Sequence, residues 1–226
     1  KRLILKINRQ GEVKLTIPDF ISIQKGKDFL ESKKSWILDH VLKKEEEKKE
    51  SLSNLFLEKN QIYYYGTLKK VEICYYDFLK KPKFVLHSYS SKEENKFSLN
   101  LPLSYKNQPS FILEALKKEF RKFAKTQLSL LFQEVSKKID ISYQKLTMRD
   151  MVSRWGSCSG KGNISLLWRL IMAPKEIIEY VMIHELCHCY ELNHSKKFWT
   201  WVQAFCPLWK QHRAWLKKQG RELFSL

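Results

Sequence analysis

Long apolar runs are missing from this chain of 226 residues, and none approaches the roughly 18–20 residues that a membrane span needs. The N-terminal residues alternate apolar and charged side chains, so they do not form the apolar core of a signal peptide. The five cysteines are an odd number and lack the spacing of a disulfide framework, a pattern typical of a reducing compartment. We therefore expect a cytoplasmic protein with no membrane contact.

Acidic residues are also scarce: 24 Asp and Glu stand against 42 Lys and Arg, which gives a formal net charge of +18. The excess is spread over both halves of the chain and forms no arginine-rich patch. A field of this sign attracts polyanions, so non-specific DNA binding is one hypothesis. A solvated, lysine-rich surface is the other, and composition leaves both open.

The first half of the chain is rich in strand patterns. Residues 1–17 alternate like a β-hairpin with its turn at Gly11, residues 27–50 follow a helical period, and residues 61–101 contain several short strands. We predict a β-rich N-terminal region over residues 1–105. Aromatic residues at Tyr63–Tyr65 fit packing in a half-buried strand, and stacking on nucleic-acid bases is the alternative.

Helical patterns dominate residues 106–226, which we predict to form a second domain. Pro109 and Ser110 begin a long amphipathic helix. Residues 146–171 resemble a pair of strands around a turn at residues 160–162, and Pro174 suits the first position of another helix. The predicted apolar stripe of the long helix consists of Ile112, Leu116, Phe120, Phe123, Leu131 and Val135.

The last predicted helix contains the motif His-Glu-Leu-Cys-His. His184 and His188 lie one turn apart on the same helical face, where two imidazoles can chelate one Zn²⁺ ion. Glu185 is rotated roughly 100° from His184, which suits a general base that accepts the proton of an attacking water. The motif therefore predicts a catalytic zinc site.

A catalytic zinc site usually has three protein ligands and one open position. Asn193 can end the helix and turn the chain back, so we favour His194 as the third ligand. We interpret Cys187 and Cys189 as small buried residues rather than zinc ligands, because a thiolate ligand would favour a closed, structural site. The remaining candidates are Glu191 and His212.

Several further blocks accompany this motif: Trp36-Ile37, residues 154–159, residues 163–166, residues 168–170, Ala173-Pro174, residues 193–195, Phe198-Trp199, residues 215–217 and Gly220. Together with residues 184–188, these blocks make the chain similar to the YgjP-like metallopeptidase family, which is related to the SprT-like zincins. The resemblance implies a zincin fold, His184, His188 and His194 as zinc ligands, and Glu185 as the catalytic base. SprT-like relatives also suggest proteolysis coupled to DNA.

We thus expect an α+β protein in which a β-rich N-terminal region precedes a zincin-like metallopeptidase domain with a small antiparallel sheet. Small residues at Gly156 and Ser157, next to a buried Trp155, suit a strand that packs closely on the metal-binding helix. Arg154 and Arg169 are candidates to stabilise an oxyanion or to form ion pairs. The substrate would be a protein or peptide. A zinc amidase and a nucleic-acid-binding protein with a structural zinc are the alternatives.

Overall fold

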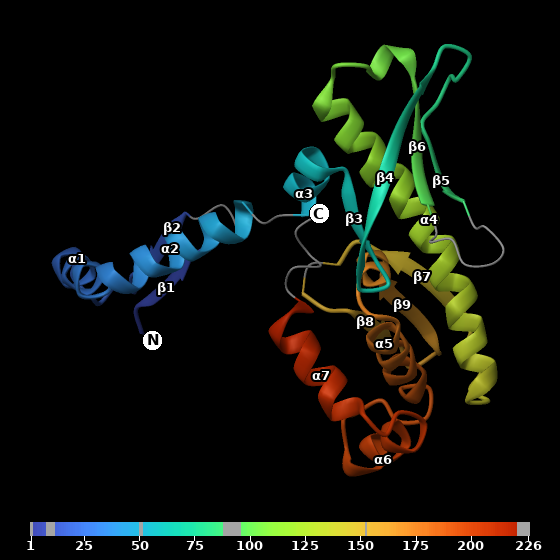
Figure 1. Ribbon diagram of the computed structural model, residues 1–226. Helices are drawn as coiled ribbons and strands as arrows, with labels where there is room; N and C mark the ends of the chain where they lie inside the picture. Colours follow the sequence, from blue (N-terminus) through green and yellow to red (C-terminus); the bar gives the residue numbers. More distant parts are fainter. Residues whose placement is uncertain (1, 8–11, 50–51, 88–95, 152, 221–226) are drawn as a thin grey trace. The chain divides into compact units, whose positions relative to one another are not determined.

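The computed structural model describes residues 2–7, 12–49, 52–87, 96–151 and 153–220 (Figure 1). The chain divides into two compact units, Lys1–Asn54 and Leu55–Leu226. The boundary near residue 105 that the sequence suggests lies inside the second unit. At that point strands give way to a helix within one compact unit.

The first unit contains an antiparallel hairpin followed by two helices. The predicted hairpin is confirmed, with Ile4 opposite Thr16 and Ile7 opposite Val13, whereas its turn at Gly11 lies outside the described residues. The helical period of residues 27–50 proves to be two helices that break at Lys33. The elements are β1 (Ile4–Ile7), β2 (Val13–Thr16), α1 (Ile23–Ser32) and α2 (Lys34–Lys49).

The second unit contains two sheets, and the α+β class is confirmed. The first sheet has the strand order β3-β4-β6-β5, and only its β4–β6 pair is parallel. It is preceded by α3 (Leu52–Lys59) and followed by a short 3₁₀ helix, η1 (Leu103–Tyr105). Its strands are β3 (Gln61–Tyr64), β4 (Thr67–Tyr76), β5 (Lys83–His87) and β6 (Lys96–Pro102).

The second sheet has the order β7-β9-β8, with β7 parallel and β8 antiparallel to the central strand β9. The prediction of a small antiparallel sheet is therefore wrong, because the sheet is mixed. The residues after β9 form a 3₁₀ helix, η2 (Trp168–Met172), in which four of five side chains are buried, whereas a strand would alternate. The strands are β7 (Lys145–Arg149), β8 (Gly156–Cys158) and β9 (Asn163–Leu167).

The long helix α4 (Pro109–Lys138) contacts the first sheet, η2 and the helix α5 (Lys175–Cys187) (Figure 1). Five of its six predicted stripe residues are buried, and the exception, Phe123, is partly exposed but joins an aromatic cluster. In this cluster the ring of Phe120 lies 5.3 Å from that of Phe84 and 6.2 Å from that of Trp168. The cluster fixes the first sheet and η2 on the same helix. Two further helices, α6 (Lys196–Phe205) and α7 (Trp209–Lys218), complete the unit.

The β3–β4 turn touches the start of α5. Tyr65 and Gly66 both have positive φ, as a tight two-residue hairpin turn requires. Their amides donate to the carbonyls of Ile171 (2.9 Å) and Met172 (3.1 Å). A β-carbon on Gly66 would lie 2.8–2.9 Å from atoms of Pro174, so the absent side chain lets the hairpin seat on the residue that caps α5.

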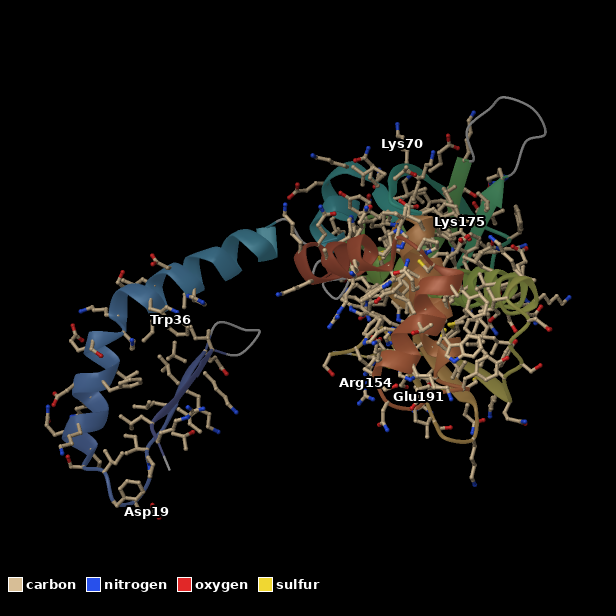
Figure 2. All side chains as sticks on the ribbon, turned by 90° about the horizontal axis from the view of Figure 1, so that it is seen from below. Asp19, Trp36, Lys70, Arg154, Lys175 and Glu191 are labelled. Atoms are coloured by element: carbon tan, nitrogen blue, oxygen red, sulfur yellow. The ribbon has the colours of Figure 1, made fainter. Side chains whose placement is uncertain are left out.

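Basic side chains are exposed on the surface of the second unit. Lys70, Arg154 and Lys175 are exposed at well-separated positions on the second unit (Figure 2). Tyr64 is buried against Phe97 with an edge-to-face ring contact, so it belongs to the core and cannot stack on a base. Within the described ranges, no helix combines the length and the apolar character needed to cross a bilayer.

Candidate metal centre

The helix α5 presents His184 and Glu185 in its last turn and ends at Cys187, with His188 in the C-cap position. Two expectations need correction. Pro174 is the N-cap residue rather than the first helical residue, because its carbonyl accepts the amide of Ile178. The helix also ends before Asn193.

The chain reverses immediately after the helix. The amides of Cys189 and Glu191 donate to the carbonyls of Leu186 and Cys187, which closes the last turn of α5. Ser195 then caps the next helix, α6, since its hydroxyl accepts the amide of Phe198 at 3.2 Å. His194 precedes this cap, so the tight reversal returns its side chain to α5.

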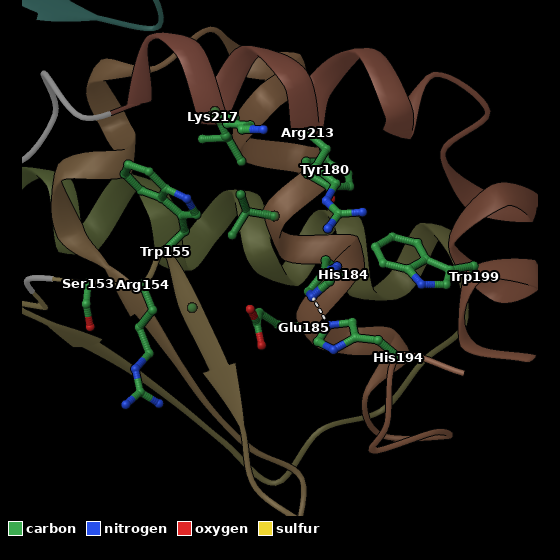
Figure 3. Close-up of a pocket in the computed structure, with 13 residues that line it drawn as sticks. Ser153, Arg154, Trp155, Tyr180, His184, Glu185, His194, Trp199, Arg213 and Lys217 are labelled. Carbon is green, nitrogen blue, oxygen red and sulfur yellow. Dashed lines mark hydrogen bonds between the residues drawn. The ribbon is translucent and has the colours of Figure 1, made fainter. Parts of the chain in front are cut away.

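Three imidazoles converge at this reversal, and Figure 3 shows two of them, His184 and His194. Nε2 of His194 lies 3.0 Å from Nε2 of His184, and the nearest ring nitrogens of the three residues lie within 4.8 Å of one another. Nδ1 of His188 donates to the carbonyl of Glu191 at 2.9 Å. This hydrogen bond fixes the orientation of the ring and leaves Nε2 of His188 as the nitrogen that can bind a metal ion.

The donor set fits a divalent metal ion. Two nitrogens at ~2.0–2.1 Å from one tetrahedral ion lie roughly 3.3 Å apart, close to the separation of the two Nε2 atoms. Burial, followed by the other two imidazoles, lowers the pKa of His184 to about 3. Burial also lowers the pKa of His194. Neutral imidazoles are the form that binds metal, so no proton needs to leave these two rings at neutral pH.

Phe198 supports all three rings from the first turn of α6. It is fully buried, and its ring centroid lies 4.9 Å from those of His184 and His194 and 4.4 Å from that of His188, on which it stacks. Phe198 therefore packs against all three imidazoles from a position four residues after His194.

Glu185 lies beside the three imidazoles, against the edge strand β8. A β-carbon on Gly156 would lie 2.6 Å from both Cγ and Oε1 of Glu185, which confirms the close packing expected at this glycine. Burial raises the pKa of Glu185 to about 8, and Arg154 partly offsets this rise. The neighbouring Trp155 is only half-buried, contrary to expectation, because it forms part of a cavity wall.

Two cavities meet at this centre. One, of about 540 Å³, is lined by residues from the loop before β8, α5 and α7 (Figure 3). The other, of about 240 Å³, runs beside β8 and the end of α5. Residues shared by both are Gly156, His184, Glu185 and His194.

The other candidates for a third ligand lie elsewhere in the structure. Glu191 uses its backbone carbonyl to orient His188, and Cys187 is fully buried. Cys189 faces Cys158, with 3.9 Å between their sulfur atoms. His212 contacts Cys206, its Nδ1 lying 3.4 Å from the sulfur. Among the described residues, none of these side chains joins the group of three histidines.

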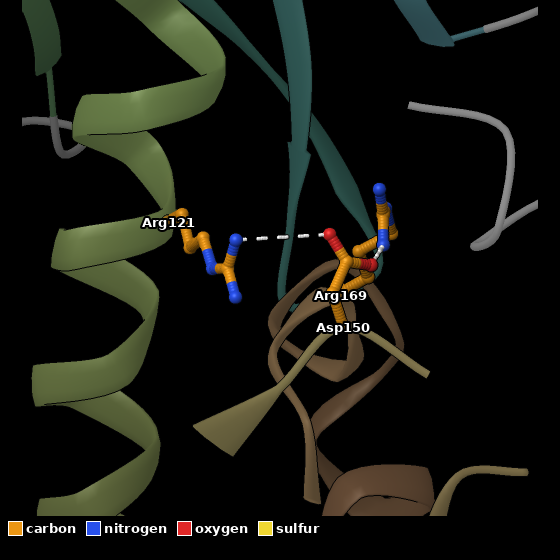
Figure 4. Close-up of polar contacts among 3 residues, drawn as sticks. All are labelled: Arg121, Asp150 and Arg169. Carbon is orange, nitrogen blue, oxygen red and sulfur yellow. Dashed lines mark hydrogen bonds and ion pairs between the residues drawn. The ribbon is translucent and has the colours of Figure 1, made fainter. Parts of the chain in front are cut away.

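The two arginines have different surroundings. Arg169 forms an ion pair with Asp150, which also lies 3.8 Å from Arg121 (Figure 4). Burial is the largest single effect and would raise the pKa of Asp150, but the hydrogen bond and charge of Arg169, together with Trp168 and Arg121, outweigh it, so the pKa is lowered. Arg169 is therefore a structural residue. Arg154 is exposed and lines the larger cavity.

Sequence analysis assigned no role in the site to several residues that line the larger cavity, among them Tyr180, Arg213 and Lys217. Tyr180 lies one turn before His184, and burial raises its pKa to about 12, so it remains a hydroxyl donor. Arg213 and Lys217 lie one turn apart on α7. Their i, i+4 spacing is visible in the sequence, but only the fold brings α7 against α5.

A model of the YgjP-like metallopeptidase domain matches residues 1–219. The chain matches none of the curated proteins and none of the solved structures with which it was compared. The family match covers both compact units and includes the helix and the reversal that bring the three histidines together. This chain is a member of the YgjP-like family of metallopeptidase domains.

Proposed function

We propose that the protein is a zinc-dependent metallopeptidase in which His184, His188 and His194 hold the ion and Glu185 is the general base. The observation that carries the proposal is the convergence of three imidazoles beside one buried carboxyl group, at the junction of two cavities. When bound, the zinc ion would polarise the scissile carbonyl and make water more acidic.

Glu185 would accept the proton of the attacking water and pass it to the leaving amine. In the chain without metal, its pKa of about 8 keeps much of this group protonated at neutral pH. A cation at the three imidazoles favours the ionised form. The base would therefore become competent only when the metal site is filled, which couples metal binding to activity.

Glu185 and His188 would be positioned for this chemistry by their neighbours. The absent side chain of Gly156 gives the Glu185 carboxylate its place, and the Glu191 carbonyl holds the His188 ring. Such supports keep reacting groups in one geometry, which contributes more to catalysis than the same groups held loosely.

The position of β8 at the edge of its sheet is an argument for a peptide substrate. It pairs only with β9 among the described strands, and its residues Gly156–Cys158 line the smaller cavity. An extended peptide can add to such an edge through main-chain hydrogen bonds, which gives broad sequence tolerance. An open strand edge favours a peptide over the compact substrate of an amidase. Three donors rather than four among the described residues favour a catalytic zinc over a structural one.

A digest of a peptide library tests the proposal. Native protein and the Glu185→Gln variant are loaded with zinc, checked for equal metal content, and incubated with the library, and new termini are identified by mass spectrometry. We expect cuts with the native protein alone, because the amide cannot accept the proton. Equal cutting by both proteins would remove Glu185 from this role, and no cutting by either would contradict the peptidase proposal.

A further inference from the structure

The larger cavity beside the metal centre is rich in positive charge. Its lining includes the cationic side chains of Arg154, Arg213 and Lys217, whereas Glu185 is its single carboxyl group among the described residues. Glu185 lies on the side that the cavity shares with β8. The wall formed by α7 therefore offers two cations and the apolar Leu216, and no carboxyl group.

Arg213 is the cation that the structure holds in a defined place. Its Cζ lies 5.1 Å from the ring centroid of Trp199, over the ring. Trp199 stacks in turn on Trp209 (4.1 Å, 19°) and on His194 (5.7 Å, 27°). A guanidinium stacked in this way keeps its planar set of donors available and loses less freedom on binding a planar anion. Figure 3 shows Arg213 reaching from α7 towards His184.

The protein supplies no counter-ion at this position within the described residues. The helix α7 contains no acidic residue, and the described ion pairs do not include Arg213 or Lys217. Lys210, another basic residue of α7, lies over the ring of Trp209 and does not line the cavity. Arg213 and Lys217, one turn apart, share the face that does.

We infer that Arg213, assisted by Lys217, binds a carboxylate of the peptide substrate close to the scissile bond. A guanidinium donates two parallel hydrogen bonds to a carboxylate, a geometry that neutral side chains do not match. The carboxylate is either the side chain of Asp or Glu or the C-terminal group of the substrate. This inference rests on the proposed peptidase function and gives it a substrate class.

Three matched peptides test the inference at fixed, moderate ionic strength. The first has Gln on the C-terminal side of a site cut in the library and an amidated end, the second has Glu in that place, and the third keeps Gln but has a free C-terminus at that place. We expect kcat/KM for one of the carboxylate peptides to exceed that of the neutral peptide by about tenfold, the factor for one charge-assisted hydrogen bond. The preferred peptide identifies the source of the carboxylate.

Two variants of α7 separate a specific site from general charge. Arg213→Met should bring the ratio of carboxylate to neutral kcat/KM close to one, with most of the change in KM. Lys210→Met removes the same charge from the same helix and should keep the native ratio. Arg213→Lys should recover only part of it, because Lys lacks the planar fork.

The outcomes distinguish this inference from the proposed function. If the native protein cuts all three peptides equally, or if Lys210→Met changes the ratio as much as Arg213→Met does, the carboxylate site is refuted and the peptidase proposal stands. If the zinc-loaded native protein cuts none of the peptides nor any member of the library, the peptidase proposal itself fails. A preference lost only in Arg213→Met supports the site.

Discussion

Replacing Glu185 with Gln should stabilise the protein in its metal-free form. The side chain of Glu185 is 5% exposed, and burial raises its pKa from 4.5 to about 8. The unfolded chain loses this proton near pH 4.5, whereas the folded chain keeps it until about pH 8. The free energy of unfolding therefore falls as the pH rises through this window, because the group's contribution is complete below 4.5 and lost above 8.

The size of the effect follows from the shift. One pKa unit corresponds to about 1.4 kcal/mol, so the rise from 4.5 to about 8 corresponds to roughly 5 kcal/mol at most. Glutamine has the same shape and no charge. We expect the free energy of unfolding of the metal-free Glu185→Gln variant to exceed that of the native protein by about 2–5 kcal/mol above pH 8 and to equal it near pH 4.5. Zinc should reduce the difference, because the cation favours the carboxylate.

The assay is urea unfolding of chelator-treated protein at several pH values, followed by tryptophan fluorescence. Six of the seven tryptophans lie in the second unit, so the signal reports mainly on the unit that contains Glu185. The exposed carboxylate of Glu114, changed to Gln, controls for the loss of one negative charge. If native protein and Glu185→Gln lose stability equally between pH 4.5 and 8, the burial argument is refuted.

Two further predictions concern the site, and a third concerns the net charge. Gly156→Ala should lower kcat by about 100-fold at unchanged zinc content, because the new β-carbon displaces the Glu185 carboxylate; Gly160→Ala, whose β-carbon has ordinary contacts, should stay near native in the same assay. His194→Ala should weaken zinc binding by more than about 100-fold in chelator competition, whereas His212→Ala should not, and the reverse order would exclude His194 as a ligand. If the +18 charge serves DNA binding, the logarithm of the DNA affinity should fall by about 0.7–0.9 per neutralised phosphate for each tenfold rise in salt concentration. Unchanged cleavage rate and substrate choice on adding DNA at near-physiological salt would exclude a coupled function.

Local patterns made much of the second unit predictable from sequence. The apolar period of α4 and the alternation of the strands depend on side chains close in the chain, so the sequence predicts both. The spacing of His184 and His188 likewise follows from helix geometry alone. The family to which the chain belongs was also visible in its linked sequence blocks.

Features that depend on long-range contacts were less predictable. The end of the predicted strand pair, residues 168–171, instead lies in the 3₁₀ helix η2, in which four of five residues are buried. The parallel pairing of β7 with β9 has no local sequence signal, because it depends on how the chain returns across the sheet. Arg213 joins the cavity only because α7 packs on α5.

The chain reversal after α5 was predicted in part from the sequence. Asn193 suggested a helix end, yet the helix ends at Cys187 because the amides of Cys189 and Glu191 bond to carbonyls of its last turn. The predicted position of His194 did not depend on the residue at which the helix ends. Ser195 as the cap of α6 returns the chain to the same place.

The central proposal, that zinc held by three histidines serves peptide hydrolysis, is tested most directly by titrating zinc into metal-free protein. Bound zinc and peptide cleavage are measured in the same samples. The proposal predicts that the native rate rises in proportion to bound zinc and levels off at one ion per chain, while zinc-loaded Glu185→Gln stays at background. A native rate that is independent of bound zinc, or an equal rate in the zinc-loaded variant, would contradict it.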